Sequence, residues 1–283
     1  MIERENELLA EHTTIRIGGR AEKFYIPENE SELRQILIKH QNAGIISGGS
    51  NLLINDRKVF PAVVSMEKCC VELIWNADGS VYAGSSVRAQ QLIRTLNQWG
   101  LGGIEYLYSL PAMVGGMVFM NAGRGGDKKS IADHIISVRY MTRDGDIAEL
   151  PAEDCHFEYR KSLFQDKDWV ILGALFRFEP IDTIASEQRI AEQMERCRLN
   201  QDRRFPNFGS LFGRSNQKIM VYLQKHAKSE NGRKSACLSS KSSNWVINRG
   251  EGTFSEVKRI IKKVRLLHKI AGQQCEIEVR IWE

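Results

Sequence analysis

The stretch that decides the fold reads Ile45-Ile46-Ser47-Gly48-Gly49-Ser50-Asn51-Leu52-Leu53. The apolar pair at its start predicts a buried strand that runs directly into a loop of small residues. Glycines let a dianionic group approach the backbone closely, and consecutive N–H groups supply a positive field without any lysine. The stretch therefore predicts a phosphate-binding loop at the end of a strand.

Two further clusters of small residues follow in the first half of the chain. One reads Leu110-Pro111-Ala112-Met113-Val114-Gly115-Gly116, and the other reads Asn121-Ala122-Gly123-Arg124-Gly125-Gly126. Each cluster lies beside a predicted strand or helix start, which is unusual for ordinary turns. The loops together predict one large phosphate-bearing cofactor, held by backbone amides of residues 48–52 and 111–116.

Composition is that of a globular enzyme. With 283 residues, of which 42% are hydrophobic, the chain is long enough for one large domain or for two to three lobes. The net charge of +5 slightly favours anionic small molecules and does not demand nucleic acid. The charged start and the lack of a long apolar run predict a cytoplasmic protein with no membrane partner.

The cysteines show neither a CxxC motif nor a zinc-ligand spacing. Such scattered residues are typical of reduced thiols, and no metal site is predicted. They are Cys69, Cys70, Cys155, Cys197, Cys237 and Cys275.

Residues 1–180 alternate strand and helix patterns. Strands are predicted at 13–19, 24–27, 81–84, 136–141, 170–172 and 175–178. Helices are predicted behind Ser31 as N-cap and over residues 89–99, and Asp144-Gly145 predicts a hairpin turn. A first lobe should end near Ser65 and a second at Pro180.

The last third begins with a polar helical pattern over residues 184–198, which marks a domain boundary. A strand is predicted at 244–248 and an amphipathic helix at 253–269, rich in Lys and Arg on its polar side. Beyond Phe254 no aromatic residue interleaves those charges, so a solvated helix face is favoured over a nucleic-acid surface.

Taken together, the motifs resemble those of the UDP-N-acetylenolpyruvoylglucosamine reductase (MurB) family, in the same order along the chain. The motifs are Thr13-Thr14-Ile15-Arg16-Ile17-Gly18-Gly19, Gly48-Gly49-Ser50-Asn51-Leu52-Leu53, Pro111-Ala112-Met113-Val114-Gly115-Gly116, Met120-Asn121-Ala122-Gly123, Tyr159-Arg160-Lys161-Ser162, Gly209-Ser210-Leu211-Phe212 and Glu278-Val279-Arg280.

The resemblance implies an α+β fold. A two-lobed FAD-binding domain of the vanillyl-alcohol-oxidase type would span residues 1–180, with lobes of about 1–65 and 66–180, and a smaller α+β substrate-binding domain would span 181–283. It also implies a flavoenzyme of peptidoglycan precursor synthesis. Such an enzyme uses NADPH to reduce FAD, and then reduces the enolpyruvyl ether of UDP-N-acetylglucosamine enolpyruvate to UDP-N-acetylmuramate. A monomer is favoured, and the oligomeric state stays open.

The same resemblance assigns catalytic roles. Arg160 would bind the enolpyruvyl carboxylate through its planar fork, Glu278 would lie by that carboxylate in protonated form, and Ser210 would donate a proton to the substrate carbon. Each residue alone has a structural explanation: a surface arginine, a turn serine beside Gly209 and the polar face of a C-terminal strand.

The binding residues implied by the resemblance fall in the small-residue loops. Tyr159 and Arg214 are assigned to the substrate, and Arg214 would take over a diphosphate contact that is lost with the family's lysine. The cofactor residues are Gly48, Gly49, Ser50, Asn51, Leu52, Pro111, Ala112, Val114, Gly115, Gly116, Asn121, Ala122 and Gly123.

Departures from the family pattern gather in the last third. Gly213-Arg214-Ser215 stands where Lys-Asn-Pro is usual, Ser242 stands in place of a histidine or glutamine, and an Ala-Gly-Leu-Lys-Gly segment is unrecognisable in 222–234. Pro111-Ala112-Met113 also replaces Pro-Gly-Thr. Two alternatives therefore stay open: a related flavin reductase acting on a different enolpyruvyl or unsaturated sugar nucleotide, and a non-catalytic flavin-binding or regulatory protein.

Overall fold

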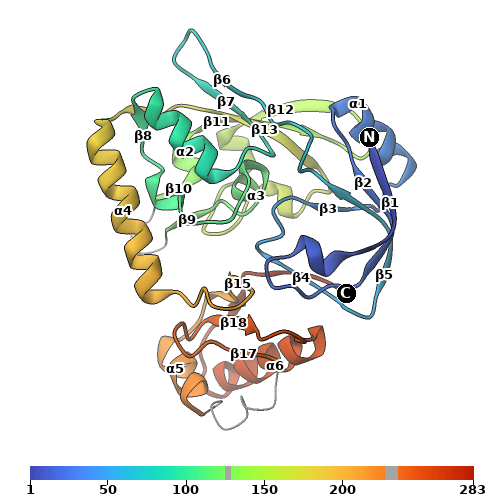
Figure 1. Ribbon diagram of the computed structural model, residues 1–283, viewed down its shortest axis with the longest axis vertical. Coiled ribbons are helices and arrows are strands. Elements are labelled where there is room, and N and C mark those ends of the chain that lie inside the picture. Colours follow the sequence, from blue (N-terminus) through green and yellow to red (C-terminus); the bar gives the residue numbers. More distant parts are fainter. Residues whose placement is uncertain (125–128, 227–234) are drawn as a thin grey trace. The chain divides into compact units, whose positions relative to one another are not determined.

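The computed structural model describes residues 1–124, 129–226 and 235–283 (Figure 1). The described chain divides into two compact units that exchange segments along the sequence. Unit 1 comprises Met1–Glu5, Lys23–Gly48 and Pro61–Arg196, and unit 2 comprises Asn6–Glu22, Gly49–Phe60 and Cys197–Glu283. The division between residues 180 and 181 stays a prediction.

The first sheet has the strand order β1-β2-β5-β3. Its strands are β1 (Ile2–Leu8), β2 (Arg20–Ile26), β5 (Val59–Ser65) and β3 (Gly44–Ile46), and β3 runs parallel to β5. Helix α1 (Glu30–Lys39) follows β2 and buries Leu33, Ile36 and Leu37 in the core of this part of unit 1.

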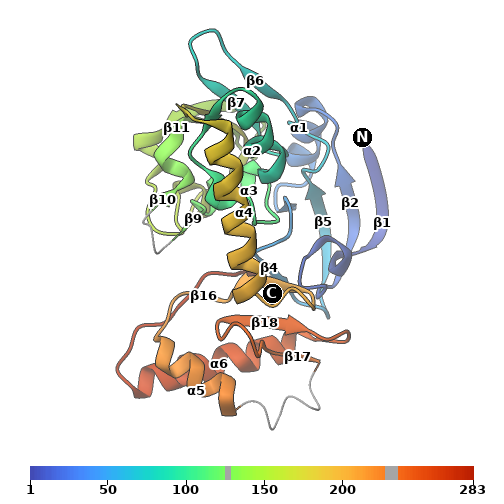
Figure 2. The same ribbon diagram turned by 60° about the vertical axis from the view of Figure 1, so that its left-hand side comes forward.

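The second sheet of unit 1 is antiparallel, with the order β12-β11-β13-β7-β6. Its strands are β6 (Leu73–Trp75), β7 (Val81–Gly84), β11 (Ile135–Met141), β12 (Ile147–Pro151) and β13 (Val170–Phe176). The helices α2 (Ala89–Gln98), α3 (Val114–Phe119) and α4 (Thr183–Asn200) belong to the same part of the chain. Ile190 of α4 and Leu92 of α2 share the core of this part (Figures 1 and 2).

Short elements connect these strands and helices. They are the pairs β8 (Leu101–Gly102) with β14 (Glu179–Pro180) and β9 (Gly123–Arg124) with β10 (Lys129–Ser130), and the 3-10 helices η1 (Leu9–His12), η2 (Glu105–Leu107), η4 (Ile131–His134), η5 (Ala152–Cys155) and η6 (Leu163–Gln165).

Unit 2 has its own sheet and core. Strands β15 (Asn207–Ser210), β18 (Trp245–Asn248) and β17 (Ala236–Leu238) lie in that order, and β16 (Phe212–Arg214) pairs with β19 (Glu276–Ile277). Strand β4 (Leu52–Ile54) runs parallel to β20 (Arg280–Trp282). Helices α5 (Gln217–His226) and α6 (Phe254–Ile270) lie side by side on one face of the β15-β18-β17 sheet (Figures 1 and 2).

Helix α6 forms where the sequence predicts it. Thr253 accepts a hydrogen bond from the Glu256 N–H, and the Glu256 carboxylate accepts one from the Thr253 N–H, which completes a capping box. Val257, Ile261 and Val264 face the core at helical spacing.

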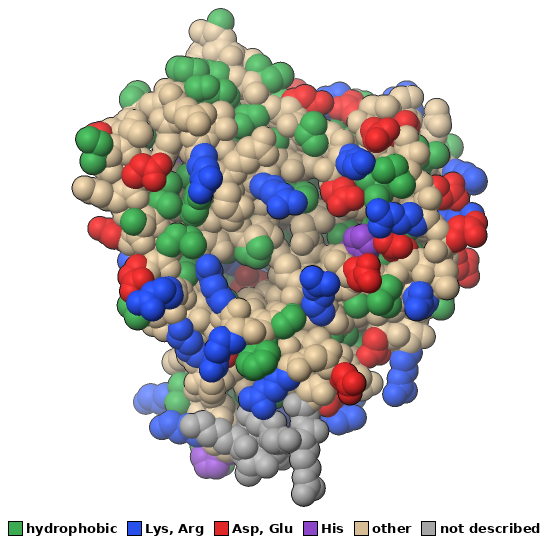
Figure 3. All heavy atoms as spheres, viewed as in Figure 1, with side chains coloured by type: hydrophobic (Ala, Val, Ile, Leu, Met, Phe, Trp, Pro, Cys, Tyr) green, Lys and Arg blue, Asp and Glu red, His purple; other side chains and the backbone are tan. Residues whose placement is uncertain are grey.

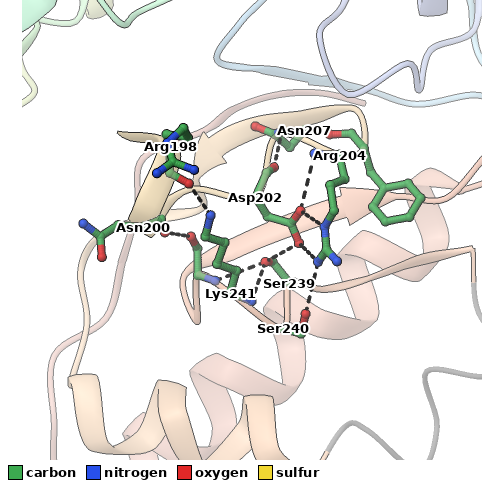
Figure 4. Close-up of polar contacts among 10 residues, drawn as sticks. Arg198, Asn200, Asp202, Arg204, Asn207, Ser239, Ser240 and Lys241 are labelled. Atoms are coloured by element: carbon green, nitrogen blue, oxygen red, sulfur yellow. Dashed lines mark hydrogen bonds and ion pairs between the residues drawn. The ribbon is translucent and has the colours of Figure 1, made fainter. Parts of the chain in front are cut away.

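A buried carboxylate organises the entry into unit 2 (Figure 4). Asp202 is fully buried and accepts hydrogen bonds from Arg204 Nε at 2.9 Å and from Ser239 Oγ at 2.9 Å. The Ser239 hydroxyl in turn accepts from the N–H groups of Lys241 and Ser242 at 3.0 and 3.1 Å. The hydrogen bond from Arg204 lowers the pKa of the Asp202 carboxyl, so the cluster is built around an ionised group.

Several local predictions are wrong, each for a local reason. Residues 13–19 form turns and loop instead of a strand, because the Thr13 hydroxyl bonds the carbonyls of Ala10 and Ile17 and Arg16 has φ of +59°. Helix α1 is capped by Asn29, whose side chain accepts from the Glu32 N–H at 3.0 Å, and not by Ser31.

The two strands predicted at 170–172 and 175–178 are one strand, β13, which continues through Gly173. A Cβ at Gly173 would lie 2.5 Å from the Tyr82 hydroxyl, so the glycine admits the tyrosine of the neighbouring strand. The predictions for β3, β7, α2, the hairpin after β11, α4 and β18 are confirmed within a residue or two of their ends.

Candidate functional site

The first two small-residue loops meet inside unit 1. A Cβ on Gly48, at the end of β3, would lie 3.2 Å from the carbonyl oxygen of Pro111. The second loop also contacts the segment that follows β7, because Ala89 N–H donates a hydrogen bond to Ala112 O at 2.9 Å. Loops that are far apart in the sequence are therefore neighbours, as one shared ligand requires.

The start of α3 packs tightly on that turn. Val114 N–H donates to Val87 O at 2.9 Å and Gly115 N–H donates to Ser85 O at 2.8 Å. Both amides are used within the chain, and the assignment of Val114 and Gly115 to the cofactor stays a prediction. A Cβ on Gly115 would lie 2.9 Å from Ser85 Cβ, which explains this glycine by packing.

Hydroxyl groups beside α3 are left without partners. Ser47 Oγ and Ser85 Oγ are buried and have no hydrogen-bond partner among residues 1–124, 129–226 and 235–283. Ser85 faces Gly115, and Ser47 Oγ would lie 3.7 Å from a Cβ on Gly116. Because a buried polar atom without a partner is costly, these hydroxyls fit a polar ligand such as the diphosphate of a nucleotide cofactor.

Gly49 is required by the chain itself. Its φ is +59°, and a Cβ there would lie 1.9 Å from the His12 carbonyl oxygen. Thr14 N–H also donates to Gly49 O at 3.1 Å. The local backbone of unit 2 therefore explains this glycine, without the close approach of a phosphate that the sequence suggested.

Asn121 organises the third small-residue loop, of which residues 125–126 lie outside the described part. Its backbone φ is +41°, its Nδ2 donates to Glu158 O at 2.8 Å and its Oδ1 accepts from Ala132 N–H at 3.3 Å. Ala122 and Gly123 follow, and Ala122 N–H donates to Met117 O at 2.8 Å. The loop is thus tied both to the end of α3 and to the hairpin that carries Arg160.

Arg160 sits on a tight turn. Glu158 and Lys161 exchange backbone hydrogen bonds of 3.2 and 3.1 Å, which leaves Tyr159 and Arg160 at the two central positions. Arg160 has φ of +59°, a conformation that a non-glycine residue adopts only where its surroundings enforce it. Such strain at a predicted carboxylate-binding residue supports a functional reading.

The Arg160 guanidinium points back at the third loop. Its Nη2 donates to Gly123 O at 2.6 Å, and its carbon lies 5.2 Å from the ring centre of the exposed Tyr159. The structure therefore groups Arg160, Tyr159, Asn121 and Gly123 in unit 1. The interpretation of Arg160 as an ordinary surface arginine does not describe this arrangement.

Ser210 is presented by a β-bulge in unit 2. Asn207 pairs with Ile247 and Ser210 with Trp245, so residues 208–209 form the irregular part of β15. Gly209 has φ of +75°, and its N–H donates to Asn207 Oδ1 at 3.0 Å. The bulge re-aims the side chain at the strand end, a common arrangement beside functional sites.

Glu278 lies next to this segment. It falls between β19 and β20 and not within a continuous strand, and its N–H donates to Leu211 O at 3.0 Å. The pairing of Phe212 with Ile277 extends the contact. Two catalytic candidates that are distant in sequence, Ser210 and Glu278, are therefore brought onto neighbouring backbone segments of unit 2.

Arg214 ends β16 on the surface. Its guanidinium lies 3.7 Å from the Glu276 carboxylate, and both side chains are more than half exposed. An exposed ion pair of this kind contributes little stability, so it presents no large barrier to another anion. The role of Arg214 in substrate binding stays a prediction.

Sequence reasoning missed Ser47, Ser85 and Tyr106. The Tyr106 hydroxyl is buried without a hydrogen-bond partner in the described part of the chain, and burial raises the pKa of its phenol. It thus remains a neutral O–H donor within electrostatic reach of Arg160. Ser47 stands inside the first loop and could have been included with its neighbours; nothing in the sequence marks the other two.

Charged side chains of both signs occur on the visible surface. Figure 3 shows Lys and Arg side chains among Asp and Glu side chains in the right half of this face, and mostly Lys and Arg side chains at its centre. The basic residues of α6 belong to its polar side, as expected. No helix in the described residues is both long and apolar enough to cross a membrane.

Comparison with known proteins identifies the class first. Residues 21–151 match the FAD binding domain family, so this is an FAD-binding protein. The chain is 33% identical to the UDP-N-acetylenolpyruvoylglucosamine reductase of Carboxydothermus hydrogenoformans, over 98% of this chain and 93% of the relative. It is 34% identical to the enzyme of the same name from Caulobacter vibrioides, over 97% and 93%.

This protein belongs to the UDP-N-acetylenolpyruvoylglucosamine reductase family. Its fold also matches the crystal structure of the Thermus caldophilus reductase, with a TM-score of 0.79 at 24% identity over all of both chains. The predicted family, the α+β fold class with its FAD-binding domain, and the prediction of an FAD-binding oxidoreductase are confirmed.

Proposed function

We propose that this protein reduces the enolpyruvyl ether of UDP-N-acetylglucosamine enolpyruvate to UDP-N-acetylmuramate, with FAD as cofactor and NADPH as reductant, in peptidoglycan precursor synthesis. The observation that carries the proposal is the juxtaposition of Ser210 and Glu278 through the 3.0 Å hydrogen bond from Glu278 N–H to Leu211 O. The FAD-binding domain is assigned to residues 1–180 and the smaller substrate-binding domain to residues 181–283.

The cofactor would be held by residues 48–52 and by the loops that flank α3. Ser47 and Ser85 offer unpartnered hydroxyls there, and Asn121 fixes the third loop through Glu158 and Ala132. FAD bound there would supply two-electron redox chemistry, with NADPH as the reductant and the substrate double bond as the acceptor.

The remaining steps fall to side chains. The Arg160 fork would bind the substrate carboxylate and stabilise the charge that spreads onto it during reduction. Ser210 would give its proton to the carbanion-like carbon, a transfer that nearby positive charge would assist by lowering the cost of the alkoxide. A protonated Glu278 would donate a hydrogen bond to the same carboxylate without repelling it.

The test is a pair of half-reactions under anaerobic conditions. NADPH should bleach the flavin band of the purified protein, and UDP-N-acetylglucosamine enolpyruvate should restore it with formation of UDP-N-acetylmuramate, identified by mass. A flavin that NADPH reduces but that this substrate does not reoxidise contradicts the proposed acceptor.

One observation favours a second candidate. Gly213-Arg214-Ser215 stands where Lys-Asn-Pro is usual in the family, and Arg214 is an exposed residue with a loose ion pair. A related reductase could therefore act on a different enolpyruvyl or unsaturated sugar nucleotide. Faster reoxidation by such a nucleotide than by UDP-N-acetylglucosamine enolpyruvate would favour this second function.

A further inference from the structure

A single asparagine connects the first small-residue loop to the segment that carries Glu278. Asn51 Nδ2 donates to the Glu278 carbonyl oxygen at 3.1 Å, and Arg280 N–H donates to the Asn51 carbonyl oxygen at 3.0 Å. The first of these bonds joins residues 227 positions apart in the chain. Parallel pairing of Arg280 with Leu52 continues the contact into β4 and β20. Asn51 is thus bonded on both sides of Val279.

These bonds matter because Glu278 lies in a gap. Strand β19 ends at Ile277 and β20 begins at Arg280, so the ladders of those strands do not hold the Glu278 peptide. Its N–H is held by Leu211 O and its C=O by the Asn51 amide. Asn51 therefore fixes one half of the backbone from which the Glu278 carboxylate projects, and Leu211, next to Ser210, fixes the other.

The direction of the Asn51 amide separates two roles for this residue. A side chain that served the cofactor would point its donor at a phosphate or at the flavin. Here the amide nitrogen donates to the Glu278 carbonyl, and the backbone groups and the Ser47 hydroxyl of the loop remain to face a phosphate. We propose that Asn51 is a positioning residue for Glu278, which couples the cofactor loop to the substrate-reducing half of the site. This inference rests on the proposed function.

A carboxylate that must meet its substrate within a fraction of an ångström is sensitive to such a contact. Loss of the Asn51 amide should leave the backbone of the cofactor loop in place and let the Glu278 segment move. The effect should therefore fall on reoxidation by substrate, and flavin content and reduction by NADPH should change less than twofold.

The experiment compares Asn51→Ala and Asn51→Asp with Asn55→Ala in the flavin-loaded protein. Asn55 lies in the same segment, and its side chain accepts from Arg57 N–H at 3.0 Å within its own turn, so it controls for loss of an asparagine. Reoxidation by UDP-N-acetylglucosamine enolpyruvate should fall about tenfold in both Asn51 variants, as expected for a displaced catalytic group. It should stay within twofold in the control.

A second readout does not depend on activity. In the flavin-free protein, hydrogen exchange of the Glu278 and Arg280 amides should be about fivefold faster in Asn51→Ala than in Asn55→Ala, the scale of one lost hydrogen bond. Asn51→Asp keeps the size of the side chain and loses the donor when ionised, so it tests the bond if Asn51→Ala fails to fold.

Several results would overturn the proposal. Loss of flavin from both Asn51 variants would assign the side chain to the cofactor, and equal slowing of reduction and reoxidation would make it merely structural. Unchanged hydrogen exchange of the Glu278 and Arg280 amides in Asn51→Ala would show that the Asn51 side chain does not hold the Glu278 segment. If the proposed function fails, the results differ from these. The reduced wild-type protein would not be reoxidised by this substrate, whereas the difference in hydrogen exchange between Asn51→Ala and Asn55→Ala would persist.

Discussion

The start of α3 in unit 1 and the segments of unit 2 that carry Ser210 and Glu278 are held in different ways. At the start of α3, backbone groups bond to one another, and the hydroxyls of Ser47 and Ser85 are left without partners in the described chain. In unit 2, asparagine side chains bind the backbone: Asn51 at Glu278, Asn207 at Gly209, and Asn244 at Phe212 with bonds of 3.1 and 2.7 Å. The first region therefore keeps unpaired hydroxyl groups that a ligand could use, whereas the second uses its polar side chains to fix the backbone next to Ser210 and Glu278.

The largest effect is expected for Ser210→Ala, which tests whether the rigid segment serves chemistry. Reoxidation by substrate should fall at least ~10²-fold, about 2.7 kcal/mol of transition-state stabilisation, as for loss of a positioned proton donor. Reduction by NADPH should stay near the wild-type rate and is the internal control. Rapid-mixing absorbance at the flavin band measures both, and equal losses would make Ser210 structural.

Gly49→Ala should destabilise the folded protein by about 2–3 kcal/mol. The new Cβ would meet His12 O at 1.9 Å in a backbone with φ of +59°. Gly79→Ala is the matched control, since Gly79 has φ of +82° and open space around it, and it should cost about 1 kcal/mol. Urea unfolding of the flavin-free proteins measures both free energies of unfolding. Equal losses of stability in the two variants would show that the backbone at His12 moves to make room for the new Cβ.

Arg160→Lys keeps the charge and loses the bidentate fork, so reoxidation should slow by roughly 30-fold, about 2 kcal/mol. Combined with Glu278→Gln, the effects should not add, because both residues would stabilise one carboxylate. A double-mutant cycle on reoxidation rates measures the coupling. Strict additivity of the two effects would show that Arg160 and Glu278 do not act on the same carboxylate.

Asp202→Asn should cost about 1–2 kcal/mol at neutral pH by weakening hydrogen bonds to a buried carboxylate. The folded-state pKa of Asp202 is lowered, so its stabilising effect is present above the unfolded pKa of about 3.9 and is lost as pH falls through the folded pKa. The difference in free energy of unfolding between the two proteins, measured with urea, should therefore become smaller as the pH is lowered. A difference that is constant with pH would assign the loss of stability to packing.

Ser85→Ala should show the smallest effect and a change of sign. In the flavin-free protein the variant should be as stable as wild type or slightly more stable, because a buried hydroxyl without a partner is removed. FAD binding should weaken about fivefold, roughly 1 kcal/mol. Flavin titration and thermal unfolding measure the two effects. Unchanged affinity would mean that this hydroxyl does not contact the cofactor.

The sequence predicted correctly those features that depend on interactions between residues close together in the chain. The amphipathic helix that begins at Thr253 and the turn at Gly145 depend on residues a few positions apart, and both were predicted. The cap of α1 was misplaced because Ser31 and Asn29 are both good caps, and the choice depends on where the helix begins. The strand predicted at 13–19 failed because alternation of Ile15 and Ile17 reflects burial, while Thr13 bonds stabilise a turn.

The sequence by itself determined the family, the FAD-binding class and the identity of the loops, because glycines and ordered motifs leave a direct record along the chain. Only the tertiary structure decided three contacts. The His12 carbonyl leaves no room for a side chain at Gly49, and the amides of Val114 and Gly115 donate to other backbone groups of the chain. The Asn51 side chain donates to the Glu278 carbonyl. Such contacts join positions far apart, and their partners are fixed by how the backbone packs, which no local pattern of residues encodes.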